Sequence, residues 1–228
     1  MKLSDKTLSI LKNFATINSG IYFKEGTNLS TVSSRKNILA DAVIDEQIPV
    51  NFAIYDLNNF LSVVSLFKEG AELDFDDKHV YIKGVNGRSG SRIKYRITSP
   101  SMIVAAPDKR PTLPSVDLSF HLSQEVFDWI IRVANVIGSP NIAIQSDGNS
   151  VKLISFDSGD DQAHSQETNL EGVSSDGKSF TLVFRTENLK MLLGAYDVEI
   201  SSKGIAKFTN SVDDITYFVT LEINSVYN

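Results

Sequence analysis

Two stretches of the sequence, YDLNNFLSVV (Tyr55–Val64) and FRTENLKMLL (Phe184–Leu193), follow one pattern although they lie 129 residues apart. Each begins with an aromatic residue, continues through a polar stretch and ends in apolar residues at matching positions. Self-similarity at a fixed interval indicates an internal repeat, and a repeat determines the architecture of the chain that contains it. The segments around these two stretches show how long the repeat is.

Each half of the chain also opens with the apolar spacing of an amphipathic helix. Ser4 and Ser123 stand directly before these segments, and serine is a favoured N-cap. Apolar residues three and four positions apart share one helical face, and a shift of 119 residues superposes Leu11 on Ile130. The two stripes are Leu8, Leu11, Phe14 and Ala15, and Val126, Trp129, Ile130, Val133 and Ile137.

Short β-like runs follow each of these helices. GIYF, NLSTVS, NILADAVI and VNFAIY come in the first half, and NIAIQ, VKLISF and SFTLVF in the second. The two stretches quoted first then predict a second helix in each half, and further strands close both halves. Turn signals occur at Asn86-Gly87, Asp147-Gly148 and Asp176-Gly177. The expected apolar faces of the second helices are Leu57, Phe60, Leu61 and Val64, and Leu189, Leu192 and Leu193.

A proline-rich segment, PSMIVAAPDKRPTLP, separates the halves. Proline lacks the backbone donor and fixes φ, so this segment cannot form a sheet centre or a long helix, and an extended, semi-rigid linker is expected. We therefore predict an α+β fold of two tandem helix–strands–helix–strands domains. Domain 1 covers residues 1–99, the connector 100–116 and domain 2 117–228.

Composition limits the class of protein. The 228 residues carry a net charge of −6 and contain no cysteine, which excludes a disulfide framework and thiolate chemistry. Residues 1–110 hold 15 Lys and Arg against 12 Asp and Glu, a balance of +3, whereas residues 111–228 hold 7 against 16, a balance of −9. The charged N-terminal segment is unlike a secretory signal, and no apolar run approaches the roughly 20 residues of a membrane span. These features predict a soluble intracellular chain.

The sequence offers no motif for catalysis, a metal or a cofactor. His79, His121 and His164 are isolated, and surface positions explain them better than zinc ligation. GVNGRSG (Gly84–Gly90) lacks the spacing of a phosphate-binding loop and is expected to be a hairpin tip. DSGDD (Asp157–Asp161) misses the ligand pattern of a calcium loop and is expected to be solvated. Only carboxylates that the fold alone brings together are left open.

The polar faces of the first-half helices are basic or neutral. Lys2, Lys6, Ser9 and Asn13 lie opposite Leu11, with Lys12 on the flank, while the second helix presents Asn58, Ser62 and Ser65. In an acidic protein such faces suit a surface that meets phosphates. A solvated face of ordinary helices explains the same pattern, and both interpretations stay open.

Several stretches resemble the DNA polymerase sliding clamps of T-even-type bacteriophages. They are MKLS (Met1–Ser4), ILKNFATINSGI (Ile10–Ile21) and YDLNNFLSVVSL (Tyr55–Leu66), and the length and duplicated layout agree along the whole chain. The resemblance implies a homotrimeric ring with helices inside and β-sheets outside. It implies no enzymatic activity and no cofactor, and a location in the cytoplasm of the infected bacterial host.

The resemblance also implies the partners. The ring encircles double-stranded DNA without reading its sequence and tethers the replicative DNA polymerase. An ATP-dependent clamp loader opens it, and clamps of this phage group support late transcription with RNA polymerase or late sigma-like factors. No membrane partner is implied.

Site residues follow from the resemblance in three groups. In the second half Asp128 and Glu187 offset the basic residues Arg132 and Lys190, so the basic lining is thin there. For Ile103 and Val104, attachment of the connector to the core is an open alternative to partner binding. The DNA-facing residues are Lys2, Lys6, Lys12, Asn13, Asn58, Ser62, Arg132 and Lys190. The subunit-interface residues are Arg92, Lys94 and Arg96, opposite Glu167 and Glu171. The partner-peptide pocket comprises Ile103, Val104, Pro107, Val226 and Tyr227.

Two other classes of protein are alternatives. A phage structural or assembly protein with duplicated β-rich domains would also be acidic, cysteine-free and oligomeric, but would not affect polymerase processivity. An enzyme would need polar residues that converge at a pocket, and the sequence shows no such cluster.

Overall fold

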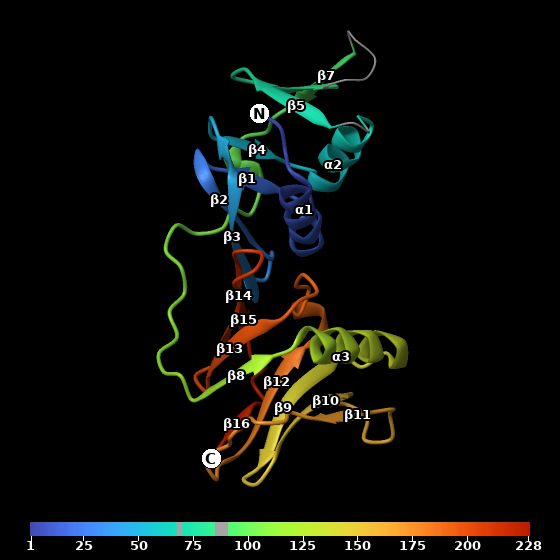
Figure 1. Cartoon of the computed structure of the whole chain (residues 1–228), viewed down its shortest axis with the longest axis vertical. Helices are drawn as coiled ribbons and strands as arrows, with labels where there is room; N and C mark the ends of the chain where they lie inside the picture. The colour runs from blue at the N-terminus through green and yellow to red at the C-terminus, as the bar shows by residue number, and fades with distance from the viewer. Residues whose placement is uncertain (68–69, 85–90) are drawn as a thin grey trace. The chain divides into compact units, whose positions relative to one another are not determined.

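The computed structural model describes residues 1–67, 70–84 and 91–228, which form two compact units (Figure 1). Unit 1 comprises Met1–Lys109 and Val212–Ile215, and unit 2 comprises Arg110–Ser211 and Thr216–Asn228. Both units mix helices with antiparallel strands, so the α+β class predicted from the sequence is confirmed. The turn expected at Asn86-Gly87 lies outside the described residues.

Unit 1 places two helices beside three groups of strands. Strand β1 pairs with β4, β2 pairs with β3, and β5-β6-β7 form a sheet in that order. Helix α2 begins where Asp56 accepts a hydrogen bond of 2.9 Å from the Asn59 N–H, which satisfies a first-turn donor. The elements are α1 (Asp5–Ile17), β1 (Ile21–Phe23), β2 (Gly26–Val32), β3 (Ile38–Ile48), β4 (Phe52–Ile54), α2 (Leu57–Ser65), β5 (Ala71–Phe75), β6 (His79–Gly84) and β7 (Arg92–Arg96).

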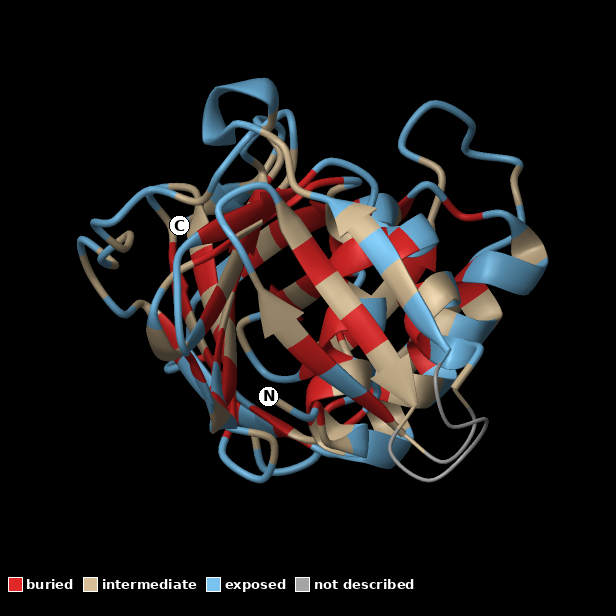
Figure 2. Cartoon of the chain, turned by 90° about the horizontal axis from the view of Figure 1, so that it is seen from above, coloured by how far each residue is buried: buried red, intermediate tan, exposed pale blue. Residues whose placement is uncertain are grey.

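The core of unit 1 is apolar and rich in aromatic rings. Burial alternates along the strands, which appear as red bands between tan and pale blue in Figure 2. The rings of Phe23 and Phe52 stack with centroids 4.4 Å apart, and Phe60 of α2 meets Tyr95 of β7 edge-on at 5.3 Å. Each such side chain contributes about 1.5–3 kcal/mol when fully buried. This packing fixes α2 against the strands.

Unit 2 contains one α-helix and two groups of strands. The strand orders are β11-β10-β9-β12-β16 and β15-β14-β13-β8. Gly148 after β9 and Gly177 before β12 have positive φ of 97° and 75°, as the two Asp-Gly turn signals predict. The elements are β8 (Leu118–Leu122), α3 (Gln124–Ile137), β9 (Asn141–Asp147), β10 (Val151–Phe156), β11 (Gln166–Asn169), β12 (Ser179–Arg185), β13 (Tyr196–Ser201), β14 (Ile205–Asn210), β15 (Ile215–Thr220) and β16 (Val226–Tyr227).

Helix α3 has the predicted cap but a different buried face. The Ser123 side chain accepts from the Val126 N–H at 3.3 Å, and Gly138 ends the helix with a left-handed φ of 72°. The side chains buried are Phe127, Ile130 and Ala134, whereas Trp129 of the predicted stripe is half exposed. The helix carries apolar residues nearly all round, so the spacing alone could not select the buried face.

The second helix predicted at Phe184–Leu193 is wrong. Strand β12 continues to Arg185, a 3₁₀ turn covers Thr186–Asn188, and the described residues from there to β13 form no helix. Arg185 stands where Asp56 stands in the first half, and it makes no capping bond.

Tertiary contacts also keep the backbone after Asn188 out of a helix. The hydroxyl of Tyr217 accepts from the Leu192 N–H at 3.1 Å, and the hydroxyl of Tyr196 donates to the Leu192 carbonyl. Leu189 and Met191, two positions apart, are both buried. That spacing belongs to an extended chain. The two units therefore repeat their strands and first helix but not the second helix.

The connector begins with a short 3₁₀ turn, Pro100–Met102, rather than with extended chain. Directly after the connector, the Asp117 N–H donates to the Ile200 carbonyl of β13 at 2.8 Å. Along the part of the chain that the structure describes, no helix combines the length and apolar character needed to cross a bilayer.

Candidate nucleic-acid interface

The orientation of α1 depends on a carboxylate at its N-terminus. The Ser4 hydroxyl accepts from the Thr7 N–H at 3.2 Å, and Glu46 of β3 accepts from the Ser4 N–H and from the Thr7 hydroxyl. Burial raises the pKa of the Glu46 carboxyl, but the hydrogen bonds from Thr7 and Ser4 outweigh it, so the pKa lies below its usual value. Glu46 is therefore ionised at neutral pH, and its negative charge interacts favourably with the positive, N-terminal end of the dipole of α1.

Backbone pairing holds Lys2 in place. The Leu73 N–H donates to the Met1 carbonyl at 2.6 Å, and Lys2 forms an isolated antiparallel bridge with Glu72. The Lys2 stem passes over Gly70, where an added Cβ would lie 2.9 Å from the Lys2 Cε. Gly70 also has a φ of +103°, which favours glycine. The side chain of Lys2 thus extends from a backbone that is held in place by pairing with residues 72 and 73.

The three lysines of the predicted DNA-facing group differ in their partners. Lys6 forms an ion pair with Asp214, another residue of unit 1, at 3.1 Å. Lys2 and Lys12 are exposed, and neither forms an ion pair with any described residue. Asn13, next to Lys12, is half-buried. The uncompensated charge therefore lies at Lys2 and Lys12.

The outward face of α2 is polar and lacks acidic residues. Asn58, Ser62 and Ser65 are exposed on it. The Ser62 hydroxyl donates to the Asn58 carbonyl at 2.8 Å, and the Ser65 hydroxyl donates to the Ser62 carbonyl at 2.7 Å. Both hydroxyls donate to backbone carbonyls of their own helix, and the face carries no charge.

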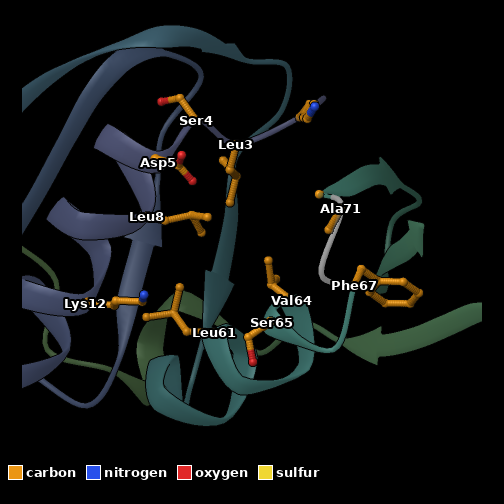
Figure 3. A pocket seen from close by; sticks show the side chains of 12 residues that line it. Leu3, Ser4, Asp5, Leu8, Lys12, Leu61, Val64, Ser65, Phe67 and Ala71 are labelled. Atoms are coloured by element: carbon orange, nitrogen blue, oxygen red, sulfur yellow. The ribbon is translucent and has the colours of Figure 1, made fainter. Parts of the chain in front are cut away.

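A groove of about 600 Å³ separates α1 from α2 (Figure 3). Leu8, Leu61 and Val64 form its apolar walls, and Lys2 and Lys12 contribute basic groups to it. The groove is thus lined by two of the predicted DNA-facing lysines, Lys2 before α1 and Lys12 within it. No spacing in the sequence indicates it.

Unit 2 carries the other two basic residues of the predicted DNA-facing group. Arg132 is exposed on α3, and Lys190 is exposed after the 3₁₀ turn. Asp128 lies one turn before Arg132, and its Oδ1 is buried without a hydrogen-bond partner among the described residues. The Glu187 Oε1 lies 3.8 Å from the Arg185 Nη1, so these two residues form an ion pair.

The first predicted interface strand, β7, lies at the edge of the β5-β6-β7 sheet. Arg92, Lys94 and Arg96 are exposed along it while the residues between them are half-buried. The Arg92 guanidinium lies 3.5 Å from the centre of the Tyr81 ring, so stacking fixes it. Tyr81 in turn donates to Asp76 at 2.7 Å, and this bond lowers the pKa of the Asp76 carboxyl.

The second predicted interface strand, β11, is the edge strand beside β10. Glu167 lies within it and forms an ion pair with Lys152 at 2.8 Å, whereas Glu171 is exposed in the turn that follows. The two strands thus present basic and acidic side chains on separate sheet edges.

The connector residues of the predicted partner pocket belong to unit 1. Ile103 is half-buried over Gly20, where an added Cβ would lie 2.7 Å from the Ile103 Cγ2. The Asn18 side chain donates to the Val104 carbonyl at 2.8 Å, while the Val104 side chain and Pro107 are exposed. Ile103 thus attaches the connector, and Val104 is accessible.

The C-terminal residues of that predicted pocket belong to unit 2 and form β16. Tyr227 stacks on Phe180 with ring centroids 5.6 Å apart, and its hydroxyl donates to the Asp117 carbonyl at 2.8 Å. Val226, beside it, is 51% exposed. Tyr227 is therefore structural as well as partly accessible, a role that its terminal position in the sequence did not indicate.

Two of the three histidines contact a carboxylate at the surface. His79 Nδ1 lies 3.2 Å from Asp76, and His121 Nδ1 lies 2.9 Å from Asp197. Within the described ranges no three potential ligand side chains gather where a metal ion could bind.

Comparison with known proteins relates this arrangement to one family. Residues 2–105 match the family model of the DNA polymerase processivity factor. The sliding clamp of Enterobacteria phage T4 is 32% identical over the full length of both chains, and that of Vibrio phage KVP40 is 30% identical over 97% of this chain and 99% of its own.

Solved structures agree at the level of the fold. PCNA of A. fulgidus, solved with the C-terminal region of FEN-1 bound, superposes with a TM-score of 0.64 at 16% identity over 96% of each chain. This likeness confirms the DNA clamp fold, which the resemblance to phage sliding clamps implied. Because it is 30–32% identical to two phage sliding clamps along nearly its whole length, the chain belongs to the sliding-clamp family of DNA polymerase processivity factors, in the branch of the T4-type phages.

Proposed function

We propose that this chain forms a homotrimeric ring that encircles duplex DNA and tethers the replicative DNA polymerase to its template. Membership of the sliding-clamp family supports this function over that of a phage structural or assembly protein. DNA is held topologically, by the closed ring, and without sequence readout. The lysine, asparagine and serine side chains of the helix faces would contact phosphates, which carry no sequence information.

One observation carries the proposal for DNA. In a chain of net charge −6, Lys2 and Lys12 form no ion pair with any residue that the structure describes, and α2 presents only neutral residues on the same surface. Asn13, Asn58 and Ser62 extend this surface. Lys6, paired with Asp214, contributes less. Arg132 and Lys190 supply weaker contacts from domain 2, which suits a protein that must slide.

Assembly of the ring would use the two sheet edges. A head-to-tail ring requires two different, complementary surfaces on each subunit. The basic edge, with Arg92, Lys94 and Arg96, and the acidic edge, with Glu167 and Glu171, are such a pair. Strand addition between β7 of one subunit and β11 of the next would satisfy backbone groups that an isolated edge exposes.

The domain layout of the proposal is the one expected from the sequence. Residues 1–99 and 117–228 are the two clamp domains, and 100–116 connect them. The polymerase would attach by a short apolar segment at Ile103, Val104 and Pro107 and at Val226 and Tyr227. The exposed side chains of Val104 and Val226 support this placement.

The remaining partners are those that the resemblance to phage sliding clamps implies. An ATP-dependent loader opens the ring around DNA, and the loaded clamp supports late transcription through RNA polymerase or a late sigma-like factor. The protein itself performs no catalysis and acts in the cytoplasm of the infected bacterium. Residues that converge for acid–base or nucleophilic chemistry are not needed for any of these steps.

Primer extension on a long primed circular template tests the proposal. The cognate polymerase is assayed with and without this protein, its loader and ATP. Longer products per binding event are expected only when all components are present, because the ring must be opened and closed around DNA. Product lengths that do not change when the protein is added would overturn it.

A further inference from the structure

Helix α3 leaves one apolar flank exposed. Trp129 and Val136 are 50% and 81% exposed, and Val133 between them is half-buried. The three residues lie four and three positions apart, so they form one stripe along the helix. A contiguous apolar stripe on a protein surface indicates an interaction site, and tryptophan is enriched among the residues that contribute most to binding.

This stripe faces the free edge of a sheet. Helix α3 packs against β10 and β11, and β11 is the edge strand of its sheet (Figure 1). On the other flank of the helix, Phe127 is buried and lines the same internal cavity as Leu189. Leu189 follows β12, which lies beyond β9 from β11. Because the stripe lies on the other side of the buried face of α3, it is turned towards β11.

The corresponding flank of α1 is covered in unit 1. Ile10 and Phe14, which the shift of 119 residues superposes on Trp129 and Val133, are 1% and 0% exposed. Thr7, one turn before Ile10, donates to Glu46 of β3. Strand β3 is 11 residues long, whereas β11 has only 4. Unit 2 thus has a shorter strand where unit 1 covers its helix, and a second molecule can take that place.

Helix α2 has an apolar flank beside the other predicted interface strand, β7. Leu61 faces the groove shared with α1. Val63 and Leu66, three positions apart, lie on the other side of the helix; Val63 is half-buried and Leu66 is 69% exposed. On that side Phe60 meets Tyr95 of β7. The uncovered flank of α2 is therefore near the edge formed by β7.

We propose that the stripe of α3 in one subunit packs against Val63 and Leu66 of α2 in the next subunit. The inference rests on the ring proposed above and adds an apolar contact to the charged joint between its sheet edges. Strand addition between β11 and β7 would bring together the helices nearest these edges, and packed helices lie about 8–10 Å apart. Charged pairs alone would hold the ring weakly, because exposed ion pairs contribute little and Glu167 already pairs with Lys152.

The fluorescence of the full chain tests this contact directly. The chain contains a single tryptophan, so the emission reports on Trp129. Emission spectra and sedimentation velocity are recorded over a range of protein concentrations. The emission is expected to move to shorter wavelength over the same concentrations at which trimers form, because the indole ring becomes buried. A trimer whose emission matches that of the dissociated chain overturns the inference and leaves ring formation standing, whereas a monomer at every concentration overturns both.

Two substitutions test the two sides of the contact. Leu66→Asp places a carboxylate against the stripe and should raise the concentration at which half of the chains are trimeric by about tenfold. The emission of Trp129 should then stay at longer wavelength at concentrations where the wild type is assembled. Val136→Asp, on the stripe itself, should weaken assembly in the same way. Val50→Asp, at an exposed valine between β3 and β4, is the matched control and leaves assembly and emission unchanged.

Urea unfolding of the dilute variants separates lost contact from lost folding. Both Leu66→Asp and Val136→Asp should unfold at the urea concentration of the dilute wild type, because both side chains are exposed in the single chain. Normal assembly of both variants overturns the inference. So does an emission shift that appears when a short DNA duplex or the C-terminal peptide of the polymerase is added but not on assembly, because the stripe would then have a different occupant.

Discussion

The carboxylate of Glu46 accepts a hydrogen bond of 2.6 Å from the hydroxyl of Thr7, 39 positions away in the sequence. The same carboxylate accepts from the backbone of Ser4, the N-cap of α1. Strand β3 therefore holds the first turn of the helix that carries Lys6 and Lys12. Core packing on the other side of α1, through Leu11 and Phe14, fixes its rotation.

Replacing Glu46 should destabilise the protein in a pH-dependent way. Glu46→Gln removes charged hydrogen bonds and lowers the free energy of unfolding by about 1–3 kcal/mol at pH 7. Because the pKa of the folded carboxyl is lowered, this contribution is complete above the ordinary glutamate pKa of about 4.3 and is lost as the pH falls through the folded value.

Urea denaturation of wild type and Glu46→Gln at a series of pH values measures this effect. The difference between the two proteins should shrink as the pH is lowered below the ordinary glutamate pKa. Asp45→Asn, at the exposed neighbouring position, is the control and should change little. A difference that stays constant down to acidic pH would show that the carboxylate charge is not what stabilises α1.

Much of the fold was accessible from the sequence because local signals agreed with the tertiary structure. Ser4 and Ser123 cap helices as expected, and the alternating strands form where predicted. The second helix of unit 2 failed because the pattern of Leu189, Leu192 and Leu193 fits a helix, yet the hydroxyls of Tyr196 and Tyr217 bind the Leu192 backbone. Long-range hydrogen bonds of this kind leave no mark in a local pattern.

The candidate site was less accessible for a related reason. The lysines of α1 could be placed on one face, but the partner of Lys6 is Asp214, 208 positions away. The groove, likewise, is lined by residues from α1, from α2 and from positions 70 and 71. Helical spacing identifies a face, whereas charge compensation and depth depend on contacts between distant segments.

The two lysines of α1 should contribute unequally to DNA binding. Lys12→Gln removes a charge that forms no ion pair with the residues described, so the slope of the logarithm of affinity against the logarithm of salt concentration should decrease in magnitude by about 0.9. Lys6→Gln should have a smaller effect, because Asp214 already offsets that charge. Anisotropy titrations of a labelled short duplex at several salt concentrations measure both slopes. Equal slopes for the two variants would contradict the role assigned to Asp214.

Charge reversal on β7 should weaken the ring. Lys94→Glu combined with Arg96→Glu would place carboxylates against the acidic edge of the next subunit and should shift sedimentation from trimer towards monomer, more strongly at low salt. Arg92 is left intact because it stacks on Tyr81 within the same sheet. Lys78→Glu, in the exposed turn before β6, is the matched control. A double variant that sediments as the intact trimer at low salt would remove β7 from the interface.

The C-terminal strand should depend on one hydroxyl. Tyr227→Phe keeps the ring stacked on Phe180 but removes the hydrogen bond to the Asp117 carbonyl, which should cost about 1 kcal/mol. Thermal or urea unfolding measures the loss. Tyr55→Phe is the control because Tyr55 is 63% exposed. Equal stability of the two variants would show that the hydroxyl of Tyr227 does not hold the start of β8 to β16.

The contact between Gly20 and Ile103 allows the role of the connector to be tested by a double mutant. Gly20→Ala would place a Cβ 2.7 Å from the Ile103 Cγ2, closer than real Cβ contacts allow. We expect it to displace the connector and to weaken binding of the cognate polymerase's C-terminal peptide. Gly20→Ala with Ile103→Ala removes the shortest contact and leaves ones of 3.2 Å, so it should recover part of the lost binding. The two single variants and the double variant form a cycle whose coupling energy should be about 0.5–3 kcal/mol, measured by peptide titration with melting temperature as the folding control. If Gly20→Ala is stable and binds the peptide normally, the partner does not depend on the position of the connector, and the pocket lies elsewhere.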